Sequence, residues 1–175
     1  MDNGASSYRR FLDGDKAAFE EIVNELFRPL VFFILGYVGN VHDAEDVAID
    51  AFSDLIVNPR RYNFKTSLKT YLFMIGKSRA VDLLRHRKTA VTADLSEAED
   101  LADRDELEST VIRNEEKRAL ARAVRELPGD MRAAVHLVYF EDMTYDEAAK
   151  IMKKTRKQVD NLICRAKSEL KKALL

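Results

Sequence analysis

The sequence of 175 residues contains no tryptophan, one cysteine, three prolines and six glycines. Its single cysteine, Cys164, excludes an intramolecular disulfide and any cysteine-based zinc cage. No apolar run approaches the roughly 20 residues that a membrane-spanning helix requires. The N-terminal stretch Met1–Arg10 is polar and lacks the apolar segment of a signal peptide. These absences predict a cytoplasmic protein that is not itself a membrane protein.

The residue patterns that support catalysis are also missing. The three histidines, His42, His86 and His136, are far apart and have no neighbours at metal-ligand spacing. The sequence has no glycine-rich phosphate loop and no nucleophile motif. We therefore expect no enzyme activity: no catalytic residue, no metal site, no cofactor and no small-molecule substrate.

What the sequence does contain is strongly segregated charge. The formal net charge is only −1, but residues 58–91 hold nine basic side chains and one acidic one. Residues 150–175 hold nine basic and two acidic side chains, whereas residues 1–57 and 92–118 are predominantly acidic. One basic block alone would indicate the solvated face of a helix. Two such blocks, each within a recognisable motif, predict two contacts with a polyanion such as DNA.

Apolar residues recur at three- and four-residue steps, which predicts an all-α fold. No strand-like alternation of useful length occurs. The polar, acidic stretch 89–104 predicts a flexible linker. The chain is therefore expected to form a helical domain 1–88, a linker 89–104 and a smaller helical domain 105–175. The expected helices run from after Asp15 to Gly39, from Asp43 to Val57, from Thr66 or Ser67 to Lys88, from Leu107 to Leu127 and from Asp130 to Phe140.

Two capping boxes lie close together near the C-terminus. Thr144 with Glu147, and Thr155 with Gln158, match the pattern in which a threonine and the side chain three residues later cap a helix reciprocally. Two helix starts this close leave room only for a helix of about two turns, Tyr145–Met152, and a tight turn. This pattern predicts a helix-turn-helix, whose second helix enters the major groove. A plain helical hairpin with a solvated basic face is the alternative.

On that second helix, Arg156, Lys157 and Asn161 lie off the packing face and can hydrogen-bond base edges. Arg165 and Lys167 are better placed for phosphates, which give affinity without reading sequence. Asp160 is repelled by phosphate. It is expected either to accept from a cytosine amino group or to hold Arg156 or Lys157 in place.

Three stretches of the first half complete a larger pattern. They are the acidic turn Asp43–Val47 followed by Phe52, the loop Arg60–Ser67 and the basic helix Tyr71–Arg87. Together with Leu127-Pro128 and the helix-turn-helix, they resemble the extracytoplasmic-function (ECF) group of bacterial RNA polymerase sigma factors, in the sigma-70 family. The resemblance spans roughly residues 15–170, in the family's order.

This resemblance implies a factor that directs core RNA polymerase to promoter DNA and helps to open it. The acidic turn resembles the segment that grips the clamp helices of the polymerase's largest subunit, which implies contacts at Asp43, Glu45 and Asp46. A simple N-cap is the alternative for Asp43. The family also implies an anti-sigma factor that occludes both domains. The C-terminal basic helix resembles the reader of the −35 element, which implies contacts at Thr155, Arg156, Lys157, Asp160, Asn161, Arg165 and Lys167.

The loop and basic helix of the first half resemble the element that separates the strands of the −10 region and holds a flipped base. The chain departs from the family's common residues at Ile49, Tyr71, Ser78 and Asp160. At Tyr71, core packing competes with stacking on a base. The implied −10 contacts are Arg61, Tyr62, Asn63, Phe64, Lys65, Thr66, Lys69, Lys77, Arg79, Arg85, Arg87 and Lys88.

Two other classes of protein account for only part of these sequence features. A conventional helix-turn-helix regulator, which acts without replacing a sigma factor, would explain the C-terminal half. It would leave the acidic turn and the first basic block unused. A helical adaptor that does not bind DNA would not explain the charge segregation.

Overall fold

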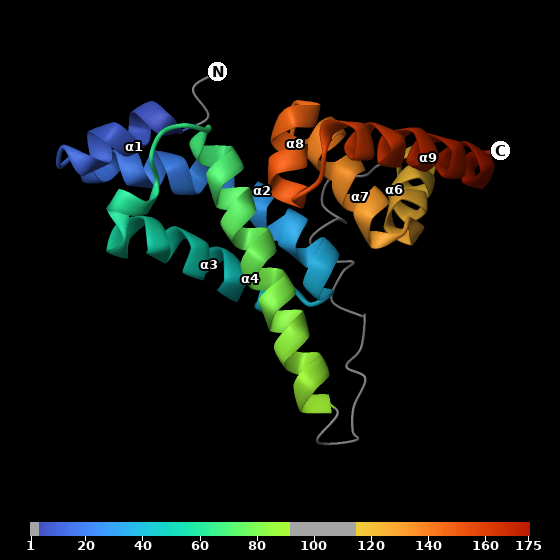
Figure 1. Ribbon diagram of the computed structural model, residues 1–175, viewed down its shortest axis with the longest axis horizontal. Coiled ribbons are helices and arrows are strands. Elements are labelled where there is room, and N and C mark those ends of the chain that lie inside the picture. The colour runs from blue at the N-terminus through green and yellow to red at the C-terminus, as the bar shows by residue number, and fades with distance from the viewer. Residues whose placement is uncertain (1–3, 92–114) are drawn as a thin grey trace.

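The computed structural model describes residues 4–91 and 115–175, and every regular element within those ranges is helical. The helices form two groups that lie side by side (Figure 1). The long helix α4 crosses between them, and its C-terminal end projects away from both. The elements are α1 (Ala5–Leu12), α2 (Lys16–Val38), α3 (Val41–Val57), a 3-10 turn (Pro59–Arg61), α4 (Leu68–Val91), α6 (Glu115–Glu126), α7 (Gly129–Val135), a π-helical segment (His136–Phe140), α8 (Tyr145–Met152) and α9 (Arg156–Leu174).

Helix α2 begins and ends where the sequence predicts. The Asp15 carboxylate accepts from the backbone amides of Ala17 and Ala18, which satisfies two of the free donors at the helix start. Gly39 ends the helix with φ 79°, a left-handed conformation that glycine adopts without a steric penalty. The helix continues past Pro29. Helix α2 packs against α1, α3 and α4 and is the centre of the N-terminal group.

The next two helices differ from expectation at their ends. Helix α3 starts at Val41, before the expected Asp43, because the Asn40 side chain accepts from the Asp43 amide and is the N-cap. Helix α4 is preceded by Ser67, whose hydroxyl accepts from the Thr70 amide, and it extends to Val91, past the expected end at Lys88. Helix α1 was not expected at all. It has eight residues, too few for a clear periodic signal.

The C-terminal group contains the predicted helix-turn-helix. Both capping boxes are present, at Thr144 with Glu147 and at Thr155 with Gln158. Lys153 turns the chain between α8 and α9 in a left-handed conformation, with φ 54°. Before them, the helix expected to run to Phe140 is α-helical only to Val135 and then widens into the π-helical segment. The expected linker lies almost wholly outside the described residues, as does the start of the helix expected from Leu107.

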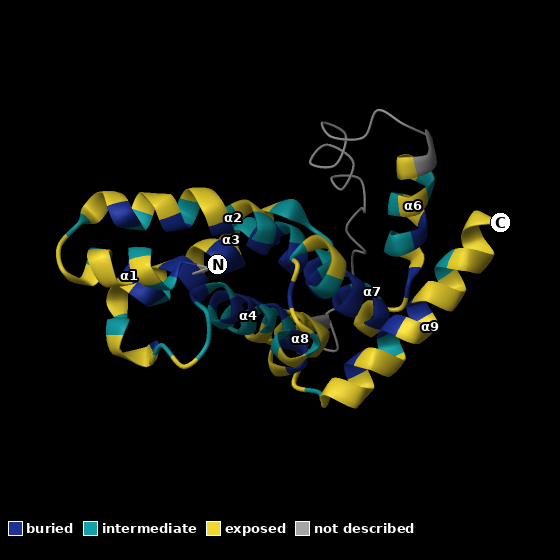
Figure 2. Ribbon diagram, turned by 90° about the horizontal axis from the view of Figure 1, so that it is seen from above, coloured by how far each residue is buried: buried dark blue, intermediate teal, exposed yellow. Residues whose placement is uncertain are grey.

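One buried apolar cluster runs through both groups. Leu30, Ile34 and Phe73 contribute from α2 and α4, and Leu137 and Ile151 contribute from the C-terminal side. The two groups meet where α8 packs on α4 and α7 packs on α2. Figure 2 shows buried surface along these inner helix faces and exposed surface along the outer faces of α2 and α9. The described helices therefore form one packed body.

Candidate polymerase and nucleic-acid interfaces

The acidic turn lies in the first two turns of α3. Asp43 is not free, because its carboxylate forms a two-point ion pair with Arg87, with Nη1–Oδ2 at 2.7 Å and Nη2–Oδ1 at 2.8 Å. It is also not the N-cap, since Asn40 fills that position. Glu45 is half-buried and Asp46 is exposed. Three residues beyond Asp46, Ile49 is 52% exposed, so α3 presents an apolar side chain beside an acidic one on the same face.

The loop before α4 is built on aromatic packing. Tyr62 is only 3% exposed, and its hydroxyl donates to the Thr66 carbonyl at 2.6 Å. Tyr62 was expected to contact DNA, but this burial makes it a core residue. Phe64, half-buried with φ 60°, packs on the Tyr62 ring at 4.6 Å between centroids. The Tyr71 ring also packs on Tyr62, at 5.0 Å between centroids, which agrees with the core packing expected for Tyr71.

The remaining −10 candidates spread over the loop and along α4. Arg61 pairs with Asp54, and Arg79 lies 3.8 Å from the carboxylates of Asp50 and Asp54. Neighbouring acids of α3 thus orient these cations. The exposed members of the set are Arg61, Asn63, Lys65, Arg85, Arg87 and Lys88, and the half-buried ones are Phe64, Thr66, Lys69, Lys77 and Arg79.

Two of the half-buried cations bond to the C-terminal group. The Lys69 ammonium lies 2.9 Å from Oε2 of Glu141 and donates to the Glu141 carbonyl at 3.0 Å. The Lys77 ammonium donates to the Met152 carbonyl at 2.9 Å, and burial lowers the pKa of Lys77. These partners are 72 and 75 residues away in sequence, and no local pattern could have revealed them.

Glu141 is held from two sides. Burial alone would raise its pKa, but hydrogen bonds from His136 and Lys69 outweigh that effect, so the pKa of Glu141 lies below its usual range. His136 Nε2 lies 3.1 Å from Oε1. The carboxylate is therefore charged at neutral pH and fixed in position.

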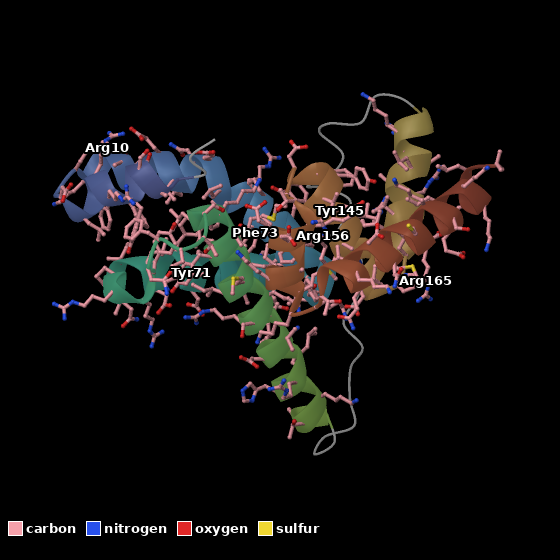
Figure 3. All side chains as sticks on the ribbon, turned by 45° about the horizontal axis from the view of Figure 1, so that its top comes forward. Arg10, Tyr71, Phe73, Tyr145, Arg156 and Arg165 are labelled. Atoms are coloured by element: carbon pink, nitrogen blue, oxygen red, sulfur yellow. The ribbon has the colours of Figure 1, made fainter. Side chains whose placement is uncertain are left out.

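The helix-turn-helix presents a continuous polar face. All seven −35 candidates are exposed, and the packing face of α9 is formed by Val159, Ile163 and Ala166. Figure 3 shows the Arg165 side chain extending from α9 away from the domain. The Thr155 hydroxyl accepts from the Gln158 amide, so it is a capping group before it is a DNA contact. Arg156 lies 3.6 Å from Asp146 of α8, in an ion pair between two exposed side chains.

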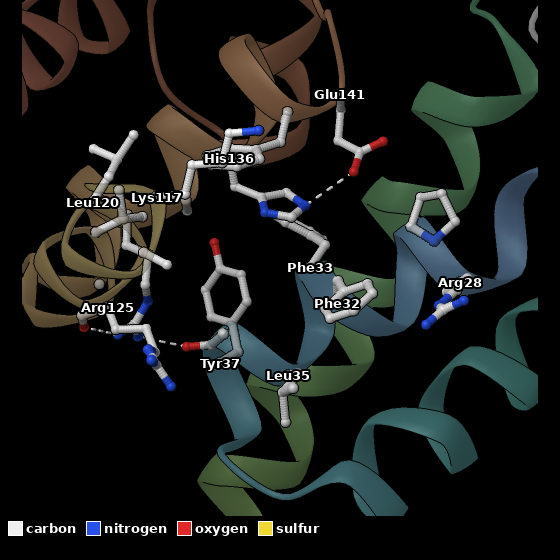
Figure 4. A pocket seen from close by; sticks show the side chains of 18 residues that line it. Arg28, Phe32, Phe33, Leu35, Tyr37, Lys117, Leu120, Arg125, His136 and Glu141 are labelled. Atoms are coloured by element: carbon white, nitrogen blue, oxygen red, sulfur yellow. Dashed lines mark hydrogen bonds and ion pairs between the residues drawn. The ribbon is translucent and has the colours of Figure 1, made fainter. Parts of the chain in front are cut away.

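A groove with apolar walls lies between the two groups. It has a volume of about 690 Å³ and is lined mainly by α2 on one side and by α6 and α7 on the other. Phe140 and Leu120 are 58% and 41% exposed there. The Tyr37 hydroxyl points into the space between these helices and has no hydrogen-bond partner (Figure 4). The sequence did not indicate this groove, because its walls come from segments far apart in the chain.

Comparison with known proteins identifies the family. Residues 22–90 match the family model for sigma-70 region 2, and residues 117–170 match that for sigma-70, region 4. The chain is 30% identical over 137 residues to the ECF RNA polymerase sigma factor RpoE of Cereibacter sphaeroides, covering 77% of this chain and 74% of the relative. The chain belongs to the ECF sigma factors of the sigma-70 family.

Other sigma factors match over a greater length. The RNA polymerase sigma-H factor of Pseudomonas aeruginosa is 28% identical over 170 residues, which covers 92% of this chain and 88% of that one. The ECF sigma factor SigW of Bacillus subtilis is 25% identical over 170 residues, covering 92% and 91%. As an ECF sigma factor, the chain directs core RNA polymerase to promoters in transcription initiation. A conventional regulator is not favoured, because the region 2 match covers the very segment that a regulator would leave unused.

Two solved structures share the fold. The sigma factor RpoE in its complex with the anti-sigma factor NepR from Bartonella quintana superposes with a TM-score of 0.69 at 20% identity, covering 89% of this chain and 96% of that chain. CnrH, in complex with the cytosolic domain of CnrY, gives a TM-score of 0.68 at 20% identity, covering 99% and 97%. At this identity the likeness establishes the fold of this sigma factor.

The described residues contain neither a membrane-spanning helix nor a metal-binding cluster. None of the helices in the ranges 4–91 and 115–175 has a stretch long and apolar enough to span a bilayer. Over the same part of this sigma factor, no three histidine, cysteine or acidic side chains gather in a way that could hold a metal ion.

Proposed function

We propose that this sigma factor reads promoters at two points. The domain 1–88 would engage the −10 region through α4 and the loop before it, and the domain 105–175 would read the −35 element through α9. The observation that carries this proposal is the pair of basic surfaces. Residues 58–91 and 150–175 each hold nine basic side chains, and they lie in different domains with exposed members in both. A single-site regulator needs only one such surface.

The proposed −10 surface is the exposed end of α4 together with the loop. Arg85, Arg87 and Lys88 are exposed at the projecting end of the helix, and Asn63 and Lys65 are exposed in the loop. Cations spaced along a helix can follow phosphates, which gives salt-sensitive binding. Phe64 offers the aromatic face for an extruded base, because it is only half-buried, whereas Tyr62 lies in the core.

The proposed polymerase contact is the exposed face of α3. Glu45 and Asp46 offer carboxylates, and Ile49 adds an apolar side chain that is 52% exposed beside them. Protein interfaces commonly surround an apolar contact with charged groups. Asp43 would act indirectly, because its carboxylate is bonded to Arg87.

We further propose that an anti-sigma factor binds this chain, that both act in the cytoplasm, and that the chain catalyses no covalent step. The structurally similar proteins, the sigma factor RpoE and CnrH, are both in complexes with partner proteins, in the first case an anti-sigma factor. The groove between α2 and α6 is lined by apolar side chains of both domains, of which Leu120 and Phe140 of the C-terminal domain are exposed. A surface of this kind is typical of a protein contact.

The proposal is tested by reconstitution with core RNA polymerase. The holoenzyme should transcribe from discrete starting points on genomic DNA of the source organism, which core enzyme alone should not do. Chains that bind DNA but leave the polymerase's choice of starting points unchanged would refute the proposal.

The polymerase contact has its own variant. The double change Glu45→Gln and Asp46→Asn should weaken binding to core enzyme on the order of 10-fold, or about 1.4 kcal/mol, with an unchanged circular dichroism spectrum. The matched control is Glu20→Gln with Glu25→Gln, which removes the same charge from exposed positions of α2. Equal affinities for the two double variants would remove Glu45 and Asp46 from the contact.

A further inference from the structure

The docked C-terminal domain meets α4 on one particular face. Lys69 and Lys77 are eight residues apart, about two helical turns, and so lie on the same side of the helix. Both are among the −10 contacts that the family resemblance implies, although they lie outside the exposed part of the proposed −10 surface, and both bond to the C-terminal domain. Between them, Thr70 is fully buried and its hydroxyl donates to Oε1 of Glu147 at 3.3 Å.

The C-terminal domain presents a carboxylate to Lys69 and a backbone carbonyl to Lys77, and the cations Lys153 and Lys154 also lie near Lys77. The Lys69 ammonium forms an ion pair with the Glu141 carboxylate, and the two side chains are only 17% and 9% exposed. The Lys77 ammonium donates a hydrogen bond to the carbonyl of Met152, the last residue of α8. The carbonyls at a helix C-terminus lack intrahelical partners and carry the negative end of the helix dipole. A carboxylate and a helix C-terminus therefore satisfy the ammonium groups of Lys69 and Lys77.

We propose that in the free protein the C-terminal domain is an intramolecular competitor of DNA, which closes this face of α4 by placing a carboxylate on Lys69 and a helix C-terminal carbonyl on Lys77. Glu141 is the latch of this closed state. The inference rests on the proposed role of α4 in binding the −10 region. A lysine ammonium enclosed by a carboxylate and a carbonyl cannot bind phosphate at the same time, so docking and DNA binding at this face exclude each other.

The closed state affects the two DNA surfaces unequally. All seven −35 candidates on α9 stay exposed while α8 packs on α4. The free factor therefore keeps its −35 reader available and loses part of its −10 surface. Because linkage is reciprocal, any DNA that binds α4 must weaken the docking of the C-terminal domain by the same factor.

The sequence offers a matched pair of variants to test the latch. Glu141→Gln keeps the size of the side chain and removes its charge. Asp142→Asn removes the same charge one residue later. Asp142 is exposed and has φ 52°, a backbone conformation that asparagine also adopts readily. The two variants differ in that the lost charge faces Lys69 and His136 in the first and neither of them in the second.

The probe is single-stranded DNA of randomised sequence, whose phosphates bind without base recognition. Glu141→Gln should bind it on the order of 5-fold more tightly than Asp142→Asn, in the range of ordinary coupling between sites. One dye is attached to Cys164 and a second to the exposed position of Asn24 through Asn24→Cys. The energy transfer between the dyes should fall in Glu141→Gln and remain at the wild-type value in Asp142→Asn. Equal affinity and equal transfer in the two variants would overturn the latch.

A measurement on the otherwise unchanged protein serves as a second test. The dye-labelled protein keeps Glu141 and is saturated with the single-stranded DNA. The energy transfer should then fall, because bound DNA must displace the C-terminal domain. Saturation with unchanged transfer would overturn the proposal. Transcription by the wild-type holoenzyme reports on the proposed function separately. If the wild-type holoenzyme initiates at promoters but Glu141→Gln leaves the affinity for DNA unchanged, only the latch proposal fails. If the wild-type holoenzyme does not initiate at promoters, the proposed function fails.

Discussion

Arg87 and Asp43 form a two-point ion pair that ties the projecting end of α4 to the first turn of α3, with N–O distances of 2.7 and 2.8 Å. One residue was expected to contact DNA and the other to contact polymerase. Since each orients the other, a change at either position affects both surfaces. The pair also explains why Asp43 is 20% exposed, while Asp46 on the same turn is exposed.

The first prediction separates the indirect role of Asp43 from direct contact. Asp43→Asn should lower the free energy of unfolding by no more than about 1 kcal/mol, because partly exposed ion pairs contribute little, and it should release Arg87. The effect on polymerase affinity should be smaller than that of Asp46→Asn. Urea unfolding and binding to core enzyme provide the two readouts. An affinity loss as large as that of Asp46→Asn, with unchanged unfolding, would show that Asp43 itself touches the polymerase.

The second prediction concerns Tyr8, whose side chain is fully buried and donates to the Leu55 carbonyl at 2.7 Å. Burial raises its pKa to about 12, from an ordinary value of 10.0. The neutral phenol is thus favoured in the folded protein. Its stabilising effect is complete below pH 10 and should be lost as the pH rises from about 10 to 12.

Tyr8→Phe should remove this part of the alkaline loss. It should also cost about 1–3 kcal/mol at neutral pH, because the Leu55 carbonyl loses its partner. Urea unfolding at a series of pH values measures both effects. Burial likewise raises the pKa of Tyr37, so some alkaline sensitivity should remain. An unchanged slope of stability against pH in Tyr8→Phe would contradict the assignment.

The third prediction distinguishes capping from DNA contact at Thr155. Thr155→Ala should destabilise the C-terminal domain by about 1 kcal/mol, since the Gln158 amide loses its acceptor. Thr155→Ser keeps a hydroxyl and should restore most of that stability together with DNA binding. Thermal unfolding and duplex affinity are measured in parallel. Should serine restore stability but not affinity, the threonine methyl group would have to contact DNA.

The fourth prediction concerns base reading by α9. Arg156→Ala or Asn161→Ala should change base preference at the upstream element by about 1–3 kcal/mol for each lost contact. Arg165→Ala should instead weaken binding to all sequences alike and reduce its salt dependence. Selection from randomised duplexes by the holoenzyme reports both. Unchanged preference at every position in the Arg156 and Asn161 variants would exclude both residues from base reading.

Local chemistry was sufficient to predict much of this sigma factor. Asp15 and Gly39 bound α2 because a carboxylate caps free amides and glycine accepts a left-handed turn, and both effects act within a few residues. The two capping boxes predicted α8 and α9 for the same reason, and the periodic apolar residues predicted an all-helical fold. The exposed face of α9 followed from helical spacing alone.

Tertiary structure decided which of the predicted DNA-contacting residues are exposed to a partner. Tyr62 and Lys69 look alike in sequence as polar members of a basic segment, yet one is buried in an aromatic core and the other is ion-paired to Glu141. Partners 72 and 75 residues apart leave no periodic trace, because sequence spacing encodes only neighbours along one helix. The sequence by itself determined the helices and the two basic surfaces. Only the packing of α8 on α4 decided that the basic surface of α4 is partly covered. The covering depends on contacts such as the Lys69–Glu141 ion pair, which form only after the chain has folded.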